Sequence, residues 1–169
     1  MYIKHYNYLK IKLYAKPSKC SFGPKEVEYL VHIVSHEGVK VDPKKIKAIM
    51  EWPILTIIKK LRGFLGLTGY YRRFVKNYGR IVAPLTTLLK KDSFHWNEYA
   101  NVSFEQLKKT MCTTPMLATP NFTKEFIVKC NAYGNGIVVV LMQEGLPVSF
   151  ESHQLKGKIN SNLFTRRKC

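Results

Sequence analysis

The first apolar pattern in the chain has the two-residue period of a β-strand. Four apolar residues alternate with other residues over positions 27–33: Val27, Tyr29, Val31 and Ile33. His36-Glu37-Gly38 is typical of a turn, and residues 39–41 return as a short second strand. The sequence therefore predicts a β-hairpin over residues 27–41.

A helical period follows between residues 42 and 91. Asp42 followed by Pro43 indicates an N-cap and a first helical residue, and Pro53 ends that helix. Thr56 is the expected cap of the next helix. The apolar sides of these two helices comprise Ile46, Ile49, Met50, Ile57, Ile58, Leu61, Phe64 and Leu65.

Glycines and a proline divide the rest of this helical region. Gly66 and Gly69 are expected to interrupt the second helix. Residues 70–76 then continue as a short helix, and Pro84 begins a last one. The inward side chains of these short helices are Tyr71, Phe74, Val75, Leu85, Leu88 and Leu89. A helical period before the hairpin predicts an amphipathic helix with Tyr2, Tyr6, Leu9 and Leu13 on one face.

The last part of the chain predicts one more helix and three strands. Asn97 is a suitable cap for a connecting helix with one apolar face, formed by Ala100, Phe104, Leu107 and Met111. A linker with two prolines follows. The expected strands cover residues 126–130, 137–141 and 148–150, with turns at 134–136 and 144–147. Three such strands predict an antiparallel meander.

Composition limits the class of protein. Of the 169 residues, 46% are hydrophobic and 12% aromatic, which is enough for a packed core and argues against wholesale disorder. The chain has no run of 18 apolar residues, and its first residues lack the apolar core of a signal peptide. We therefore expect an intracellular protein in a reducing environment, with no membrane partner. The sequence does not indicate which intracellular compartment holds it.

Few side chains are available for metal chemistry. Only Asp42 and Asp92 are aspartates among 11 acidic residues, whereas two-metal phosphoryl chemistry uses three or four converging carboxylates. We expect Asp42 to cap a helix and Asp92 to lie in a turn. His32 and His36 span a strand and a turn, so solvated or hydrogen-bonded histidines are expected there rather than a metal site. Zinc-ligand spacing is absent from the cysteines, which are expected to be buried or idle thiols: Cys20, Cys112, Cys130 and Cys169.

Positive charge dominates the chain. Lys and Arg number 28 against 11 Asp and Glu, which gives a formal net charge of +17 at pH 7. Six basic residues and one tyrosine lie between positions 59 and 76 of the helical region: Lys59, Lys60, Arg62, Tyr70, Arg72, Arg73 and Lys76. Cations at helical spacing can track the phosphates of a nucleic acid, and an exposed ring can stack on a base. The alternative is an ordinary solvated helix face. Tyr71, in contrast, is expected to face the core.

Six segments carry a resemblance to a known family: residues 19–23, 27–39, 42–45, 61–74, 126–128 and 141–145. Together they are similar to the Pol polyprotein of gypsy-type LTR retrotransposons, over roughly residues 9–155. The run Leu-Arg-Gly-Phe-Leu-Gly-Leu-Thr-Gly-Tyr-Tyr-Arg-Arg-Phe at 61–74 resembles the thumb of that family's reverse transcriptase and is highly specific.

This resemblance implies an α+β fold in four parts. The end of a reverse-transcriptase palm, with its β-hairpin, would cover residues 1–53, and a helical thumb-like unit would cover 54–92. A connecting helix and linker would cover 93–120. A truncated antiparallel ribonuclease-H-like sheet would cover 121–169.

The sequence departs from the family at positions that carry its chemistry. Asn131 stands where the resemblance places the first catalytic aspartate of the ribonuclease-H-like domain, and an amide contributes no charge to neutralise Mg²⁺. The family's next acidic segment lines up with residues 164–169, which contain no acid. Val31 replaces the usual glycine of a primer-contacting hairpin. The paired aspartates of the family's polymerase site are not in this sequence.

The resemblance therefore implies a non-catalytic fragment of a reverse transcriptase/ribonuclease H polyprotein. Its partner would be nucleic acid bound through charge, as an RNA–DNA or DNA duplex or as a single strand, with the oligomeric state unassigned. Mg²⁺ is the cofactor of the parent family, and none is expected for this chain. Two alternatives stay open: a piece of an active RNA-directed DNA polymerase and ribonuclease H, and a degenerate gene product with no selected role.

Overall fold

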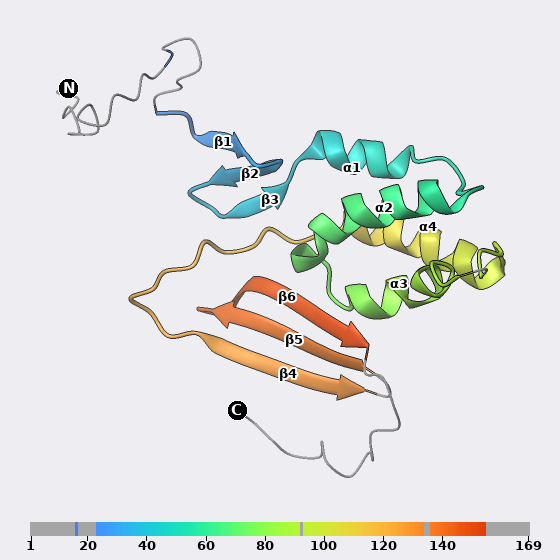
Figure 1. Cartoon of the computed structure of the whole chain (residues 1–169). Helices are drawn as coiled ribbons and strands as arrows, with labels where there is room; N and C mark the ends of the chain where they lie inside the picture. The colour runs from blue at the N-terminus through green and yellow to red at the C-terminus, as the bar shows by residue number, and fades with distance from the viewer. Residues whose placement is uncertain (1–15, 17–22, 92, 134–135, 155–169) are drawn as a thin grey trace.

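The computed structural model of the chain describes residues 16, 23–91, 93–133 and 136–154. This part contains two three-stranded antiparallel sheets and four α-helices, which confirms the expected α+β class. Figure 1 shows the first sheet at the end of the helices where α1 begins, and the second sheet as a separate layer beneath α3. The elements are β1 (Glu26–Tyr29), β2 (His32–Ser35), β3 (Val39–Val41), α1 (Pro43–Met50), α2 (Ile58–Tyr70), the 3-10 helix η3 (Arg72–Phe74), α3 (Tyr78–Thr87), α4 (Glu98–Cys112), β4 (Ile127–Tyr133), β5 (Gly136–Gln143) and β6 (Leu146–Gln154).

Some predicted features lie outside the described residues. They are the helix at residues 2–13, Cys20, Asp92, the turn residues 134–135 and the segment 164–169 with Cys169. Within the described residues, none of the helices is long and apolar enough to cross a membrane.

The single strand predicted over residues 27–33 is wrong, because the chain turns back in its middle. β1 and β2 pair antiparallel with Tyr29 opposite His32, so Leu30 and Val31 form a two-residue turn. Both turn residues have positive φ, 46° and 62°, as a tight hairpin turn of this kind requires. A left-handed conformation costs a non-glycine residue about 1–2 kcal/mol, so contacts elsewhere must hold this turn.

Local capping is a good guide to α1 but not to α2. α1 begins at Pro43, and Asp42 Oδ1 accepts a hydrogen bond from Lys44 N at 2.8 Å, as expected. The prediction that Thr56 caps α2 is wrong. The N-cap position is Ile57, whose side chain makes no capping hydrogen bond.

Gly66, Gly69 and Pro84 lie inside helices rather than at their ends. α2 runs through both glycines to Tyr70, and α3 begins at Tyr78, before Pro84. Burial of one side of each helix offsets the cost of the glycines and of the hydrogen bond that proline cannot donate. The buried residues are Leu61, Phe64 and Thr68 of α2 and Ile81, Val82 and Leu85 of α3.

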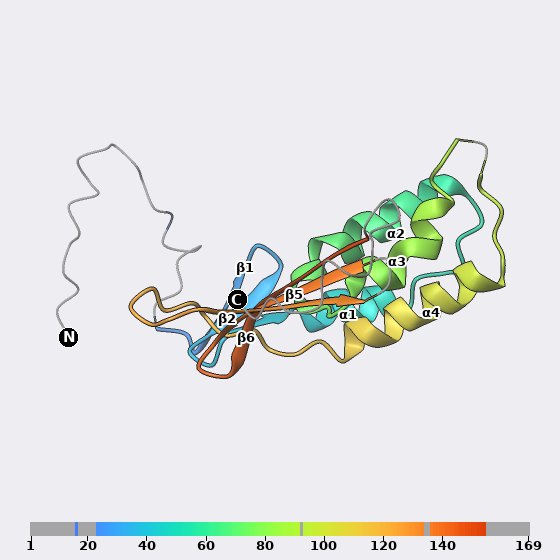
Figure 2. The same ribbon diagram turned by 90° about the horizontal axis from the view of Figure 1, so that it is seen from below.

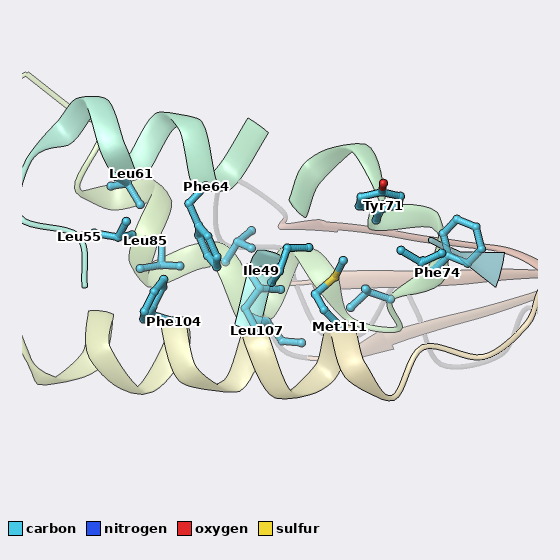
Figure 3. Close-up of a cluster of buried hydrophobic side chains, with 14 of the residues drawn as sticks. Ile49, Leu55, Leu61, Phe64, Tyr71, Phe74, Leu85, Phe104, Leu107 and Met111 are labelled. Carbon is cyan, nitrogen blue, oxygen red and sulfur yellow. The ribbon is translucent and has the colours of Figure 1, made fainter. Parts of the chain in front are cut away.

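The core is formed where α2, α3 and α4 lie side by side (Figure 2). Phe64, Leu85 and Phe104, one from each helix, converge in its centre (Figure 3), and the Phe64 and Phe104 ring centroids are 4.7 Å apart. The predicted cap and face of α4 are confirmed: Asn97 Oδ1 accepts from Ala100 N at 2.9 Å. Buried residues that the sequence placed inside include Ile49, Tyr71, Phe74, Val75, Leu88, Leu107 and Met111, whereas Met50 and Ile57 are exposed.

The predicted meander of three antiparallel strands is confirmed in the second sheet, which β6 attaches to α3. Gly79 N, in the first turn of α3, donates to Ser152 Oγ at 2.7 Å. A Cβ atom at Gly79 would lie 2.8 Å from Ser152 O, so this close approach needs a glycine. The apolar run 137–141 is only half-buried, and residues 127–132 of β4 are exposed. The sheet contacts the helices mainly through β6, with Val140 of β5 also packed against the core.

Candidate nucleic-acid interface

The outward side of α2 carries three of the predicted contact residues. Lys59, Arg62 and Tyr70 lie on one side of the helix, because positions three and eleven residues apart return to the same side at 3.6 residues per turn. All three are exposed, opposite the buried side of the helix. They extend over about 16 Å at a rise of 1.5 Å per residue. Lys60 lies to the side of this row, and its Nζ donates to Thr56 Oγ1 at 3.4 Å.

Two glycines lie between the charged and aromatic ends of this row. Gly63 and Gly66 are both exposed, and a Cβ atom at Gly66 would meet no atom within 4 Å. At Gly63 a Cβ atom would lie 3.7 Å from Trp52 Cζ2, an ordinary contact. Each glycine costs the helix about 1 kcal/mol relative to alanine, and packing does not require either of them. Gly66 is thus part of the outward face and not a helix break, and its spacing from Lys59 and Tyr70 is the sequence signal that places it there.

Tyr70 joins α2 to the hairpin. Its ring stacks on His32 with centroids 5.2 Å apart and an interplanar angle of 18°. Its hydroxyl donates to Leu30 O at 2.7 Å. The residue is 45% exposed, so part of the ring remains open to solvent while one side is occupied by the imidazole. Tyr70 is therefore a fixed ring at the hairpin turn rather than a freely moving one.

Tyr71 is buried, as expected, and makes the second link to the hairpin turn. Its hydroxyl donates to Val31 O at 3.2 Å, and none of the residue is exposed. Burial, together with the nearby Asp42 and Tyr70, raises the pKa of Tyr71 to about 12. The hydroxyl therefore keeps its proton and acts as a donor at neutral pH. The two tyrosines explain how the turn at residues 30–31 is held in an unfavourable conformation.

His32 is a packed residue and not half of a metal site. It is 8% exposed, and its Nδ1 has no hydrogen-bond partner among the described residues. Burial and the positive charge of Arg73 lower the pKa of His32, which favours the neutral ring. His36, in contrast, lies on the surface, 4.0 Å from a Glu37 carboxylate oxygen. The two histidines therefore have separate environments.

η3 and the residues after it carry three further cations. Arg72, Arg73 and Lys76 are exposed, as the sequence predicted. Arg72 Nε lies 3.8 Å from Glu151 Oε2, an exposed ion pair that contributes at most about 1 kcal/mol but connects η3 to β6. The predicted cations thus form two groups, one along α2 and one at η3, with Tyr70 between them.

Asn131 lies on β4, and its surroundings do not fit Mg²⁺. The residue lines a cavity of about 730 Å³ together with Lys76, Arg80 and Lys129, and no carboxylate is among the described lining residues. A divalent ion needs carboxylate oxygens, and cations nearby oppose its binding. In the described part of the chain, no three His, Cys, Asp or Glu side chains come together. The described cysteines, Cys112 and Cys130, are free and exposed, so neither is a buried thiol.

Comparison with known proteins connects this arrangement to a family. Residues 96–169 match the family described as the RNase H-like domain found in reverse transcriptase. The chain is 51% identical over 120 residues to the uncharacterized mitochondrial protein AtMg00860 of Arabidopsis thaliana, covering 70% of this chain and 76% of that one. It is 43% identical over 150 residues to the retrovirus-related Pol polyprotein from transposon 297 of Drosophila melanogaster. The chain belongs to the same family as AtMg00860, and it is similar to part of the retrotransposon Pol polyproteins.

The match covers most of this chain and a small share of its polyprotein relatives. It spans 87% of this chain and 14% of the transposon 297 polyprotein, and 82% and 15% for the transposon gypsy polyprotein of Drosophila melanogaster, at 37% identity. Among solved structures, the foamy viral protease-reverse transcriptase in complex with RNA/DNA hybrid matches with a TM-score of 0.73 at 21% identity, over 78% of this chain and 19% of that one. The same viral protein in complex with dsDNA also matches with a TM-score of 0.73. These structures show that this chain shares their fold.

Proposed function

We propose that the chain is the thumb-like and early ribonuclease-H-like part of a gypsy-type Pol polyprotein, and that it holds nucleic acid without catalysing a reaction on it. The observation that carries the proposal is the outward side of α2, where Lys59, Arg62 and Tyr70 flank two exposed glycines. The foamy viral proteins of the same fold were solved with dsDNA and RNA/DNA hybrid, which supports a nucleic acid as the ligand.

Charge supplies the affinity in this proposal. Each cation that neutralises a phosphate releases a condensed counterion, and this gain does not depend on base sequence. Because the two glycines have no side chains, a sugar–phosphate backbone can approach this side of α2 closely between its cations. The net charge of +17 adds a long-range attraction to any polyanion. The binding is therefore sequence-tolerant and strongly dependent on salt.

The environment of Asn131 supports the proposal that the chain does not catalyse a reaction. Hydrolysis of a phosphodiester in the parent family depends on metal ions held by carboxylates, and the described lining of the cavity at Asn131 contains no carboxylate. Lys129 and Arg80 line the same cavity as this neutral amide, and their positive charges oppose the binding of a divalent cation. The same surroundings that oppose metal binding thus favour contact with nucleic acid.

Fluorescence anisotropy with an RNA–DNA hybrid tests the proposal. For the wild-type chain, we expect the affinity to fall steeply between 50 and 200 mM salt, with a linear dependence on the logarithm of salt concentration. The double substitution Lys59→Ala and Arg62→Ala should reduce the slope by about 2, roughly one unit for each phosphate that is no longer neutralised. Lys90→Ala with Lys91→Ala removes the same charge from positions after α3 and is the matched control. Equal slopes for both double variants would show that net charge alone drives binding.

Gly66→Ala separates folding from binding on the same face. We expect the variant to be more stable by about 1 kcal/mol, because alanine favours a helix and its Cβ meets open space. The same methyl group should weaken binding of the hybrid, since it stands where the backbone is expected to approach. Urea unfolding and anisotropy measure the two effects. A variant that is more stable and binds equally well would remove the outward side of α2 from the interface.

A second function, as a piece of an active RNA-directed DNA polymerase and ribonuclease H, is favoured by the family match over residues 96–169. A Mg²⁺-dependent cleavage assay on an RNA–DNA hybrid distinguishes the two proposals. We expect no cleavage from the wild-type chain. Cleavage that is lost in Asn131→Ala would establish the enzyme instead.

A further inference from the structure

A cavity lies between α3 and the face of the second sheet that carries Asn131. Its volume, about 730 Å³, is in the range of small-molecule and cofactor sites. The geometry points to one nucleotide as its ligand, with the phosphate among the cations of the cavity and the base against its apolar floor. This inference extends the proposed nucleic-acid binding to a second surface that α2 does not form.

The charge of the cavity selects an anion. Lys76, Arg80 and Lys129 line it from the segment before α3, from α3 and from β4, respectively. No aspartate or glutamate is among its described lining residues. His153 also lines it, and its Nε2 lies 3.2 Å from Glu151 Oε1, an acid that lies outside the lining. A phosphate placed between Lys76 and Lys129 is attracted by both, and the positive charge of Arg80 adds to this attraction.

The rest of the lining fits a heterocycle better than a bare anion. Asn77, Asn131 and Gln154 line the cavity, and each side-chain amide offers both a donor and an acceptor. Donor and acceptor groups side by side match the edge of a nucleic-acid base. Val138 and Val140 of β5, both half-buried, provide an apolar surface for the face of a ring. A ligand with a phosphate, a planar apolar body and a polar edge uses all three parts of this lining.

Lys76 connects the cavity to the interface proposed above. It follows η3, where Arg72 and Arg73 are exposed, and it also lines the cavity. In this proposal, a strand held along η3 places its terminal nucleotide in the cavity. A free mononucleotide carries the same phosphate and base, so both sources of the ligand fit the site. The strand end is the form that the cations from η3 to Lys76 favour.

Titration calorimetry with adenosine monophosphate tests the cavity without the α2 interface. Binding should be detectable with the monophosphate and at least about tenfold weaker with adenosine or with inorganic phosphate, since each of these lacks one of the two groups that the cavity holds. Lys129→Ala should weaken monophosphate binding about tenfold, as expected when a charge-assisted hydrogen bond is removed. Lys90→Ala removes one positive charge outside the cavity and should leave the affinity unchanged within about twofold. Equal binding of phosphate and monophosphate would overturn the nucleotide assignment.

A blocking variant checks the position of the site without changing charge. Asn131→Trp places a large side chain on an exposed strand position, where tryptophan is well tolerated, and should abolish monophosphate binding. Circular dichroism establishes that this variant is folded. Retained binding in the folded variant would overturn the proposal, as would equal loss in Lys90→Ala.

An oligonucleotide distinguishes the two sources and separates this inference from the proposed function. A single strand with a 5′- or 3′-terminal phosphate should bind Asn131→Trp more weakly than wild type, while an internal hybrid segment with blunt hydroxyl ends should bind both equally. If only the free mononucleotide depends on Asn131→Trp, the cavity is a mononucleotide site. Loss of hybrid binding in Lys59→Ala with Arg62→Ala, with monophosphate binding intact, would support the cavity and the α2 interface as independent sites.

Discussion

The helical unit, residues 42–117, and the second sheet, β4–β6, are both rich in apolar residues but bury them to different extents. Phe64, Phe104 and Leu107 of the helical unit are completely buried. In the described part of the sheet, Phe150 is the only buried hydrophobic residue, and Val128 is 43% exposed. Several helices enclose the core side chains in the first region, whereas the second region contacts the helices mainly through β6, which lies against α3 and η3. Hydrophobic sequence thus produces a core only where several elements enclose it.

The largest expected effect is a decrease in the stability of the helical unit. Phe104→Ala removes a ring packed against Phe64 and Trp96 and should lower the free energy of unfolding by about 3–5 kcal/mol. Val139→Ala, on the half-buried β5, should cost about 1 kcal/mol or less. Urea unfolding followed by circular dichroism measures both. Similar costs for the two variants would contradict the contrast between the regions.

Gly79→Ala should detach the sheet while leaving the helices intact. Its Cβ would lie 2.8 Å from the Ser152 backbone oxygen, so β6 must move away, at an expected cost of about 1–3 kcal/mol. Hydrogen exchange should show faster exchange in β5 and β6 with little change in α4. Gly66→Ala, where the added methyl meets open space, is the control and should leave the sheet protected. Unchanged protection of β6 in Gly79→Ala would mean that this contact does not hold the sheet.

Val31→Gly should stabilise the connection between the hairpin and the helical unit. Valine at φ 62° is strained, and glycine adopts this conformation freely, so the melting temperature should rise by an amount equivalent to about 1 kcal/mol. Val27→Gly, in the exposed strand β1, lacks this benefit and should be destabilising. A lower melting temperature for Val31→Gly would show that the valine side chain contributes more than its backbone strain costs.

The smallest effect is a pH dependence that originates at His32. Because burial and Arg73 lower the pKa of His32 below 6.5, the unfolded chain takes up a proton at a higher pH than the folded chain. The free energy of unfolding should therefore decrease as the pH falls from about 7.5 through 6.5. His32→Gln should flatten this part of the profile, and His36→Gln, at an exposed position, should not. Chemical unfolding at several pH values measures the slope, and a profile unchanged in His32→Gln would exclude this origin.

Features of the fold that depend on neighbouring residues could be predicted from sequence. The caps at Asp42 and Asn97 act on amides two and three residues away, and both predictions are confirmed. The apolar face of α4 follows from its period. The turn at Leu30 and Val31 could not be found in the same way, because the hydroxyls that hold it come from residues 40 positions away. Pro84 misleads for a related reason, since tertiary burial extends α3 on both sides of it.

The candidate site could be predicted in its charges but not in its geometry. Exposure of the cations follows from the cost of burying charge, so their positions on the surface could be expected. The stacking of Tyr70 on His32 could not, because it joins α2 to the hairpin. The cavity was also invisible, since Lys76 and Arg80 meet Lys129 only after β6 has packed on α3. Sequence reveals which groups are present, and the tertiary contacts determine which of them meet.

The adjacent tyrosines at the end of α2 have a mechanical consequence. Tyr70 and Tyr71 each donate a hydrogen bond to one carbonyl of the two-residue turn. These two bonds couple the position of the hairpin turn to the end of α2. A tilt of α2 would therefore move the hairpin turn with it. A displacement of α2 at Lys59 would also move Leu30, because Tyr70 of the same helix is hydrogen-bonded to the Leu30 carbonyl.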